Sequence, residues 1–212
     1  MRDREQASLS QPAAPFPLGR RFLVIPAGMA PPPDPARLPL YIEAGGVFGS
    51  GAHPTTQLCL RALERHLPPG TPLADIGAGT GILAIAAARL GAGPILAVDT
   101  DPEAVRVARA NVLANDVAAQ VSVQPGSIAE VLAARWGAQP RAWVVANILA
   151  HVIDALFAQG LAGAVGPGGW LILSGLMRPQ TPAIRAHLQK AGLDFLAQEQ
   201  QGEWVCLLAS RQ

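Results

Sequence analysis

The stretch Asp75-Ile76-Gly77-Ala78-Gly79-Thr80-Gly81 decides the fold of this chain, because it joins a short apolar run to the apolar helical run 82–90. Three glycines in a strand-to-helix turn let the backbone adopt positive φ and approach a ligand, while the following helix offers unpaired N–H groups. A second acid, Asp99, stands 18 residues beyond Gly81, after the next apolar run. An acid at that place suits the hydroxyls of a ribose. The sequence therefore predicts a cradle for a cofactor.

The spacing of the glycines argues against a dinucleotide. The dinucleotide fingerprint is G-x-G-x-x-G, because the pyrophosphate has to lie on the helix N-terminus. Here the third glycine comes one residue early, which gives G-x-G-x-G. A tight turn without a ligand is the alternative for the glycines alone, and the two acids favour a binding site.

Composition narrows the function classes. The chain has 212 residues, of which 50% are hydrophobic, so it can bury one substantial core. The formal net charge is +1 and only Arg20 and Arg21 are adjacent basic residues, which does not favour nucleic acid. Cys59 and Cys206 are far apart, which argues against a disulfide framework and a zinc site. We expect a cytoplasmic protein with no metal, no membrane anchor and no direct nucleic-acid binding.

The prolines divide the chain. Many of the 20 prolines lie between residues 11 and 39, and the run 31–35 (PPPDP) favours polyproline II. We predict that residues 1–44 form a mobile N-terminus and a proline-rich linker with a strand near 21–25, without a core of their own. Regular patterns begin after Gly45-Gly46, so residues 45–212 are predicted to form the cofactor-binding domain.

The rest of the chain alternates between strand and helix patterns. Helices are predicted at 54–66, 82–90 and 102–115, the last with Asp101 as its N-cap. Strands are predicted at 72–75, 95–98, 120–124, 142–146, 170–174, 194–198 and 204–209. The central strands are apolar on both faces, as parallel strands between helices are. The last two are joined by Gln200-Gln201-Gly202 as an antiparallel hairpin. These patterns predict an α/β fold, a doubly wound sheet of seven strands.

Polar residues stand at three strand ends, where ligands bind in such sheets. Asp75 could equally brace the turn or contact a ligand. Asp99 is favoured for ribose contact over a simple turn role, because Asp101 already fills the capping position. The carbonyl oxygen of Asn147 can accept a hydrogen bond from an amine N–H and so orient the nitrogen lone pair. That chemistry suits group transfer to nitrogen.

A glycine-rich segment at residues 45–56 precedes the first helix of this domain and is predicted to fold over the site as a lid. The alternative is a flexible link whose last residues, Thr55 and Thr56, belong to the first helical turn. His53 is predicted to be a hydrogen-bonded loop residue rather than a metal ligand or base. His151 could line the substrate mouth or face solvent.

Several motifs together resemble the ribosomal protein L11 methyltransferase family. They are FGSGAHPTT at 48–56, DIGAGTGIL at 75–83, VDTDP at 98–102, ANIL at 146–149, LSG at 173–175 and EWV at 203–205. The similarity runs from about Arg21 to Arg211, and the combination is more specific than any single motif. The family usually has cysteine and serine where this chain has Ala78 and Thr80.

The resemblance implies a Rossmann-like methyltransferase sheet and S-adenosylmethionine as the methyl donor. The predicted cofactor-binding residues are Phe48, Thr56, Asp75, Gly77, Gly79, Gly81, Asp99 and Asn147. Asn147 and Thr56 are the predicted catalytic residues: Asn147 would orient the amine, while Thr56 and the lid would close the site.

Family members also carry a separate N-terminal recognition domain, whereas about fifty residues precede the lid here, so we expect this domain to be missing. The resemblance then implies an N-methyltransferase acting on lysine or N-terminal amines of a protein, with a target like ribosomal protein L11. The alternatives are a small-molecule amine methyltransferase and a subunit that binds S-adenosylmethionine without catalysis. An NAD-dependent oxidoreductase is a third class, disfavoured by the glycine spacing.

Overall fold

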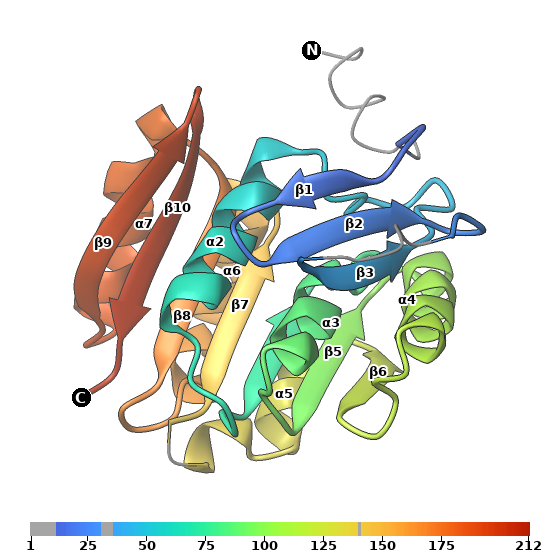
Figure 1. The fold of residues 1–212 in the computed structure, drawn as a ribbon. Coiled ribbons are helices and arrows are strands. Elements are labelled where there is room, and N and C mark those ends of the chain that lie inside the picture. The colour runs from blue at the N-terminus through green and yellow to red at the C-terminus, as the bar shows by residue number, and fades with distance from the viewer. Residues whose placement is uncertain (1–11, 31–35, 140) are drawn as a thin grey trace.

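The computed structural model describes residues 12–30, 36–139 and 141–212, so the run 31–35 lies outside it. Its main feature is a sheet of seven strands between two layers of helices (Figure 1). The strands are β4 (Leu73–Ile76), β5 (Ile95–Asp99), β6 (Val121–Pro125), β7 (Trp143–Asn147), β8 (Trp170–Met177), β9 (Asp194–Gln201) and β10 (Trp204–Ser210). Their order is β6-β5-β4-β7-β8-β10-β9. The predicted α/β fold is confirmed.

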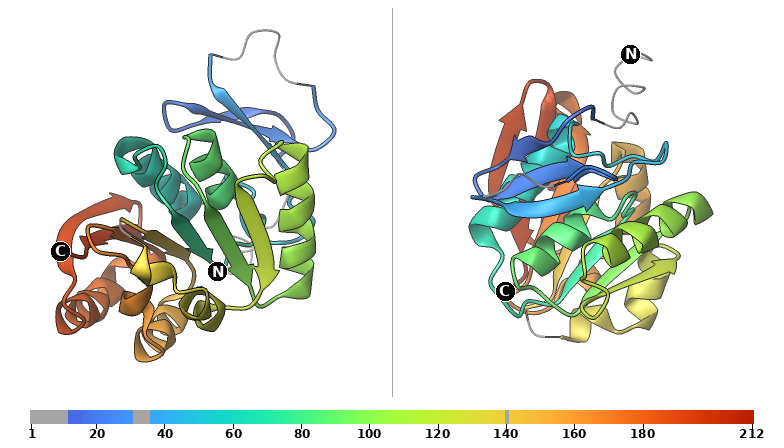
Figure 2. Two further views of the ribbon diagram at one scale, coloured as in Figure 1. Left: turned by 90° about the horizontal axis from the view of Figure 1, so that it is seen from below. Right: turned by 45° about the vertical axis from the view of Figure 1, so that its right-hand side comes forward.

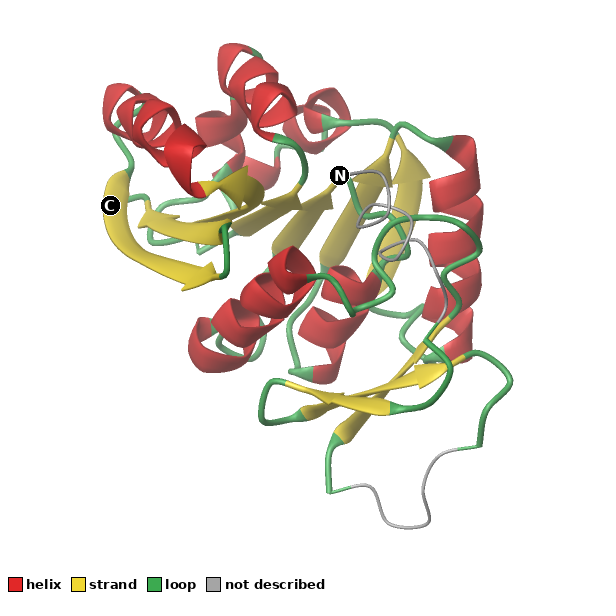
Figure 3. Cartoon of the chain, turned by 90° about the horizontal axis from the view of Figure 1, so that it is seen from above, coloured by secondary structure: helices red, strands yellow, loops and turns green. Residues whose placement is uncertain are grey.

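Strands β6, β5, β4, β7 and β8 are parallel to one another. Strand β10 runs antiparallel to both β8 and β9. Helices α2 (Pro54–His66), α3 (Ile82–Arg89) and α4 (Pro102–Ala114) cover one face. Helices α5 (Ile128–Ala133), α6 (Ala150–Ala158) and α7 (Thr181–Lys190) cover the other, as the view along the layers shows (Figure 3). The sheet is therefore doubly wound.

Alternation along the strands divides the core into two. In β4, Leu73 packs with the α2–α4 layer, whereas Ala74 and Ile76 pack with the α5–α7 layer. Successive side chains of a strand point to opposite faces, so an apolar run without polar interruptions is what a strand covered on both sides needs.

Two strands, β8 and β9, extend three residues beyond their predicted ends, whereas the other strand boundaries agree to within one residue. β8 continues past Ser174 to Met177, because Gly175 takes φ +84° and the pairing with β10 shifts register between Val205 and Leu207. Gly175 thus marks an irregularity within the strand and not its end, as glycines inside strands commonly do. β9 continues through Gln201, so the hairpin turn is Gly202-Glu203.

The proline-rich segment forms a second sheet that packs into the core of the large domain, and the strand predicted near 21–25 is confirmed as its middle strand. Strands β1 (Phe16–Leu18), β2 (Phe22–Pro26) and β3 (Leu38–Ile42) pair in that order. Phe22, Val24 and Leu40 are buried and belong to the same apolar cluster as α2 and α3. The small sheet lies over the α2–α4 layer (Figure 2). The boundary between residues 44 and 45 stays a prediction.

Helix α4 holds the open edge of the small sheet with two amide side chains. Asn115 accepts from Tyr41 N (3.0 Å) and donates to Tyr41 O (2.7 Å). Asn111 accepts from Glu43 N and donates to Glu43 O, both at 2.9 Å. Each amide thus replaces the strand neighbour that β3 lacks at this edge, which satisfies buried backbone groups.

Within the described residues, we find no helix whose length and apolar character would let it cross a membrane.

Candidate functional site

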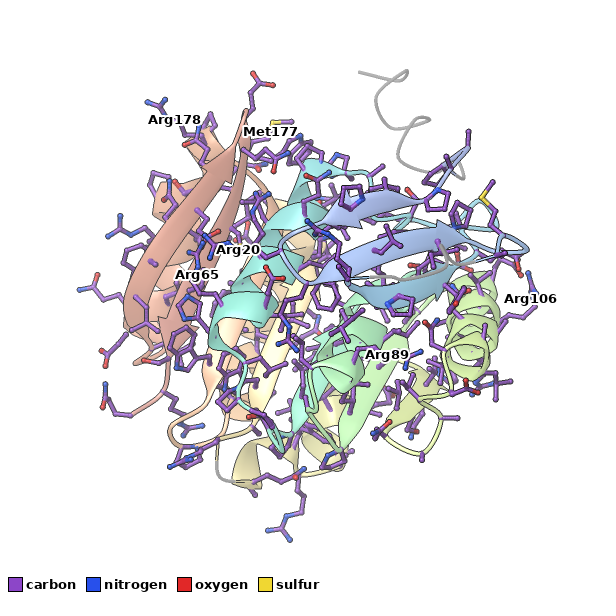
Figure 4. The ribbon with its side chains drawn as sticks, in the orientation of Figure 1. Arg20, Arg65, Arg89, Arg106, Met177 and Arg178 are labelled. Carbon is purple, nitrogen blue, oxygen red and sulfur yellow. The ribbon has the colours of Figure 1, made fainter. Side chains whose placement is uncertain are left out.

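The candidate site lies at the carboxyl edge of the large sheet, where the strand order reverses. From β4 the chain builds β5 and β6 on one side, and then β7 and β8 on the other. The glycine turn follows β4, and Asp99 and Asn147 are the last residues of β5 and β7. Met177 marks the same edge at the end of β8, at the top of Figure 4. The topology thus brings the predicted residues to the place where open α/β sheets bind ligands.

The glycine turn takes a backbone path that only glycine follows without strain. Gly77, Gly79 and Gly81 have φ values of +75°, +54° and +79°. A methyl group on Gly77 would lie 2.4 Å from Ile148 Cγ2, and one on Gly79 would lie 2.3 Å from the carbonyl oxygen of Phe48. The turn is therefore pressed between the segment after β7 and the lid.

Asp99 braces this turn. Its Oδ2 accepts from Gly79 N at 2.8 Å, and its Oδ1 accepts from Asp101 N at 3.0 Å. The side chain of Asp101 accepts from Glu103 N at 2.9 Å, which confirms it as the N-cap of α4. Asp99 is half-buried and each oxygen keeps further acceptor capacity, so contact with a ribose stays a prediction.

Asp75 lies inside β4 and not after it, and its side chain is fully buried. Its Oδ2 accepts from Ala84 N (3.1 Å) in the first turn of α3, while Oδ1 has no hydrogen-bond partner within residues 12–30, 36–139 and 141–212. The role that the geometry displays is that of bracing the helix, and ligand contact stays a prediction. Burial raises the pKa of Asp75 from 3.8 to about 7.

We expect the buried Asp75 to make stability fall as pH rises from about 4 to 7. Over this range the folded state holds the Asp75 proton while the unfolded state has released it, so unfolding becomes easier as pH rises. One proton gives a slope of at most about 1.4 kcal/mol per pH unit. Asp75→Asn does not titrate and keeps an acceptor for Ala84 N, so denaturant unfolding at several pH values should show a flatter profile. An unchanged slope would contradict this reading.

Asn147 and Thr56 meet at the centre of the site. Asn147 Nδ2 lies 3.4 Å from Thr56 Oγ1, and Thr56 is buried in the first turn of α2. The Oδ1 atom of Asn147 is buried and has no hydrogen-bond partner among the residues that the structure describes. A buried acceptor without a donor is costly, so this oxygen is the position in the site best suited to receive an N–H from a ligand.

The segment predicted as a lid lies on the glycine turn. Thr80 N donates to Phe48 O (3.0 Å), and Thr80 Oγ1 donates to Gly49 O (2.7 Å). At its end, His53 caps α2 and its Nδ1 lies 2.7 Å from Thr55 Oγ1. The prediction of a hydrogen-bonded loop histidine is therefore confirmed, and burial lowers its pKa.

Two aromatic side chains of the lid form a cluster with Trp204, which the sequence analysis did not predict. The His53 ring lies 5.3 Å from that of Phe48 and 4.8 Å from that of Trp204, both edge to face. Trp204 opens β10 and pairs with Met177. The EWV motif at 203–205 contains Trp204. The contact of Trp204 with the lid depends on the register of the last strands, which the motif does not predict.

A hollow next to Asp99 adds room to the site. Its lining residues, on α4 and at the end of β6, are Pro102, Val105, Arg106, Arg109 and Pro125. Pro125 is the register partner of Asp99, so the hollow lies beside the end of β5 that carries Asp99. Arg106, one of its lining residues, is labelled on α4 in Figure 4.

The described residues contain no group of three or more His, Cys, Asp or Glu side chains that could hold a metal ion. His151, the one histidine predicted near a strand end, is exposed on α6.

The doubly wound sheet of seven strands with its antiparallel hairpin is a Rossmann-like sheet, the fold class to which S-adenosylmethionine-dependent methyltransferases belong. A TehB-like S-adenosylmethionine-dependent methyltransferase from Corynebacterium glutamicum has this fold at 14% identity, with a TM-score of 0.55 over 73% of this chain and 87% of its own. That likeness concerns the fold alone.

The sequence model of the family described as ribosomal protein L11 methyltransferase matches residues 6–212, and the chain belongs to this family. Curated relatives with that name include one from Pelotomaculum thermopropionicum, 44% identical over 90% of this chain and 60% of its own, and one from Synechococcus, 43% identical over 93% and 65%. The chain thus spans about three fifths of these relatives. A crystal structure of ribosomal protein L11 methylase from Lactobacillus delbrueckii is 30% identical, with a TM-score of 0.82 over 94% of this chain and 99% of that one.

Proposed function

We propose that this chain is an S-adenosylmethionine-dependent N-methyltransferase whose acceptor is an amino group, lysine or N-terminal, of a cytoplasmic protein like ribosomal protein L11. The relatives named above support the acceptor class. The observation that carries the chemistry is the buried Asn147 Oδ1, an acceptor without a donor beside the glycine turn.

The residues of the site fit S-adenosylmethionine, the proposed methyl donor. Its ribose hydroxyls suit the Asp99 carboxylate, and the hollow beside Asp99 offers space for its base. Asn147 Oδ1 and Asp75 Oδ1 are buried oxygens without a hydrogen-bond partner among the described residues, which suits a ligand that carries N–H groups. When bound, S-adenosylmethionine supplies an activated methyl carbon.

Asn147 would align the acceptor amine. An N–H of the neutral amine donates to Asn147 Oδ1, which turns the nitrogen lone pair toward the reacting carbon. Thr56 Oγ1, 3.4 Å from Asn147 Nδ2, holds the amide in this orientation, so that its oxygen points to the acceptor. Neither side chain has to act as a strong base.

The acceptor must arrive without its extra proton. An α-amino group has a reference pKa of about 7.7–8.0 and is partly neutral at pH 7, whereas lysine, near 10.4, needs desolvation. The rings of Phe48 and His53 in the lid pack with the ring of Trp204, and this partly buried cluster offers the amine a surface against which to lose water. Burial of the amine against these rings lowers its pKa and favours the neutral form.

The test is transfer of label. Purified protein is incubated with methyl-labelled S-adenosylmethionine and a cytoplasmic extract, and label is counted in acid-precipitated protein and in the small-molecule fraction. We expect label in protein, in a band that contains the acceptor. Label confined to small molecules would replace the protein acceptor with a small amine, and donor binding without any transfer would indicate a non-catalytic subunit.

A further inference from the structure

The lid is fixed to the glycine turn by a hydrogen-bond network that centres on one buried side chain. Thr80 is fully buried, in the middle of the glycine turn. Its N–H donates to Phe48 O at 3.0 Å, and its hydroxyl donates to Gly49 O at 2.7 Å. Thr80 thus binds two successive lid carbonyls with two different donors.

The third polar group of Thr80 ties the turn to the start of the lid. Its carbonyl oxygen accepts from Asn111 Nδ2 at 2.9 Å. The same nitrogen donates to Glu43 O, and Asn111 Oδ1 accepts from Glu43 N, both at 2.9 Å. A continuous path therefore runs from Glu43, two residues before the lid, through Asn111 and Thr80 to Phe48 and Gly49 in the lid.

Close packing makes this contact specific. Gly49 has φ +114°, and a methyl group on it would lie 2.5 Å from Thr80 Oγ1. A methyl group on Gly79 would overlap the Phe48 carbonyl oxygen. The lid can reach the Thr80 hydroxyl only because glycine stands on both sides of the contact.

We propose that Thr80 is a positioning residue whose hydroxyl latches the lid onto the glycine turn and thereby couples lid closure to binding of the methyl donor. The coupling rests on the proposed function, because it requires the donor to bind at this turn. Phe48 and His53 belong to the lid, and the His53 ring contacts both Phe48 and Trp204. The latch therefore also positions the rings against which the acceptor amine is proposed to lie.

Coupling is reciprocal: if donor binding stabilises the closed lid, loosening the lid must weaken the donor. Without the Thr80 hydroxyl, the buried Gly49 carbonyl loses its hydrogen bond, and a lost partner of this kind commonly changes an equilibrium about five- to tenfold or more. The change should appear in the exchange rate of lid amides and in donor affinity together.

The experiment compares Thr80→Val, which keeps the shape but lacks the hydroxyl, with Thr80→Ser, which keeps the hydroxyl. Hydrogen exchange is followed in peptides that cover residues 45–53, with and without S-adenosylmethionine, and in peptides of β4 and β5 as a control for global unfolding. Donor dissociation constants are measured by calorimetry on the same proteins.

For Thr80→Val we expect lid exchange at least about fivefold faster, donor affinity weakened by a similar factor, and unchanged exchange in β4 and β5. Thr80→Ser should stay within about twofold of the parent. Equal lid exchange in the two variants would overturn the latch, and faster lid exchange with unchanged donor affinity would overturn the coupling. Absence of donor binding by the parent protein is a different failure, that of the proposed function, because the exchange comparison without donor still tests the latch.

Discussion

Asn147→Ala is expected to lower turnover by at least about tenfold, which corresponds to about 1.4 kcal/mol of activation barrier. The variant removes the buried Oδ1 that is proposed to accept the N–H of the acceptor amine, and with it the alignment of the nitrogen lone pair. The contact with Thr56 Oγ1 is lost as well. Donor affinity should fall much less, because the proposed ribose contact at Asp99 and the glycine turn remain.

The measurement is single-turnover methyl transfer at saturating donor, together with the donor dissociation constant of each protein. A loss in the rate with a nearly unchanged dissociation constant assigns Asn147 to the transfer step. Thr56→Val, which keeps the Asn147 amide but removes its neighbour, should give a smaller loss. Turnover within twofold of the parent after Asn147→Ala would refute the assignment.

Gly79→Ala is expected to weaken donor binding by at least about tenfold. The new methyl group would lie 2.3 Å from a backbone oxygen of the lid, at a φ of +54° that alanine tolerates poorly. The turn or the lid has to move, and conformational strain in the left-handed region adds about 1–2 kcal/mol.

Gly46→Ala is the matched control for that substitution. Gly46 lies in the same lid with φ +80°, but no heavy atom stands within 4 Å of an added methyl group. It carries the backbone strain without the collision. Calorimetric donor titrations should therefore separate the two variants, and equal affinities would show that the close approach of Phe48 to the turn has no importance for binding.

Most of the large sheet was predictable from the sequence, because its strands carry strong local signals. Trp143, Val144 and Val145 form an apolar run without a polar side chain, and Asp101-Pro102 marks the start of α4. The glycine turn, Asp99 and Asn147 were predictable as a group since parallel strands bring their carboxyl ends to one edge.

Of the small sheet only β2 was predicted, as a strand near 21–25, because prolines at edges and ends hide the other two strands. Pro17 lies in the outer strand β1 and Pro26 ends β2, positions at which a missing N–H is tolerated. The stability of this sheet depends on partners that are distant in sequence. Asn111 and Asn115 of the α4 region are both buried and bind the backbone of Glu43 and Tyr41, at the end of β3 and within it.

The roles of the site residues depended on contacts that spacing does not encode. From the sequence Asp75 was expected at the start of the turn, but it lies inside β4, where its side chain accepts a hydrogen bond from the first turn of α3. Thr80 reads as a small residue between glycines, and only the path of the lid makes its hydroxyl a hydrogen-bond donor to Gly49. The sequence carried one signal for the two asparagines that bind the small sheet. Asn111 and Asn115 are spaced i, i+4, next to the buried Ala108 and Val112, so they share the buried face of the helix.

Calorimetric titration of the purified protein with S-adenosylmethionine, and separately with NAD, tests the central claim most directly, namely that the glycine turn with Asp99 is a methyl-donor site. We predict saturable binding of S-adenosylmethionine at one site per chain and no binding of NAD. Binding of NAD without binding of S-adenosylmethionine would contradict the account, since it would mean that the turn from Gly77 to Gly81 holds a dinucleotide despite its spacing.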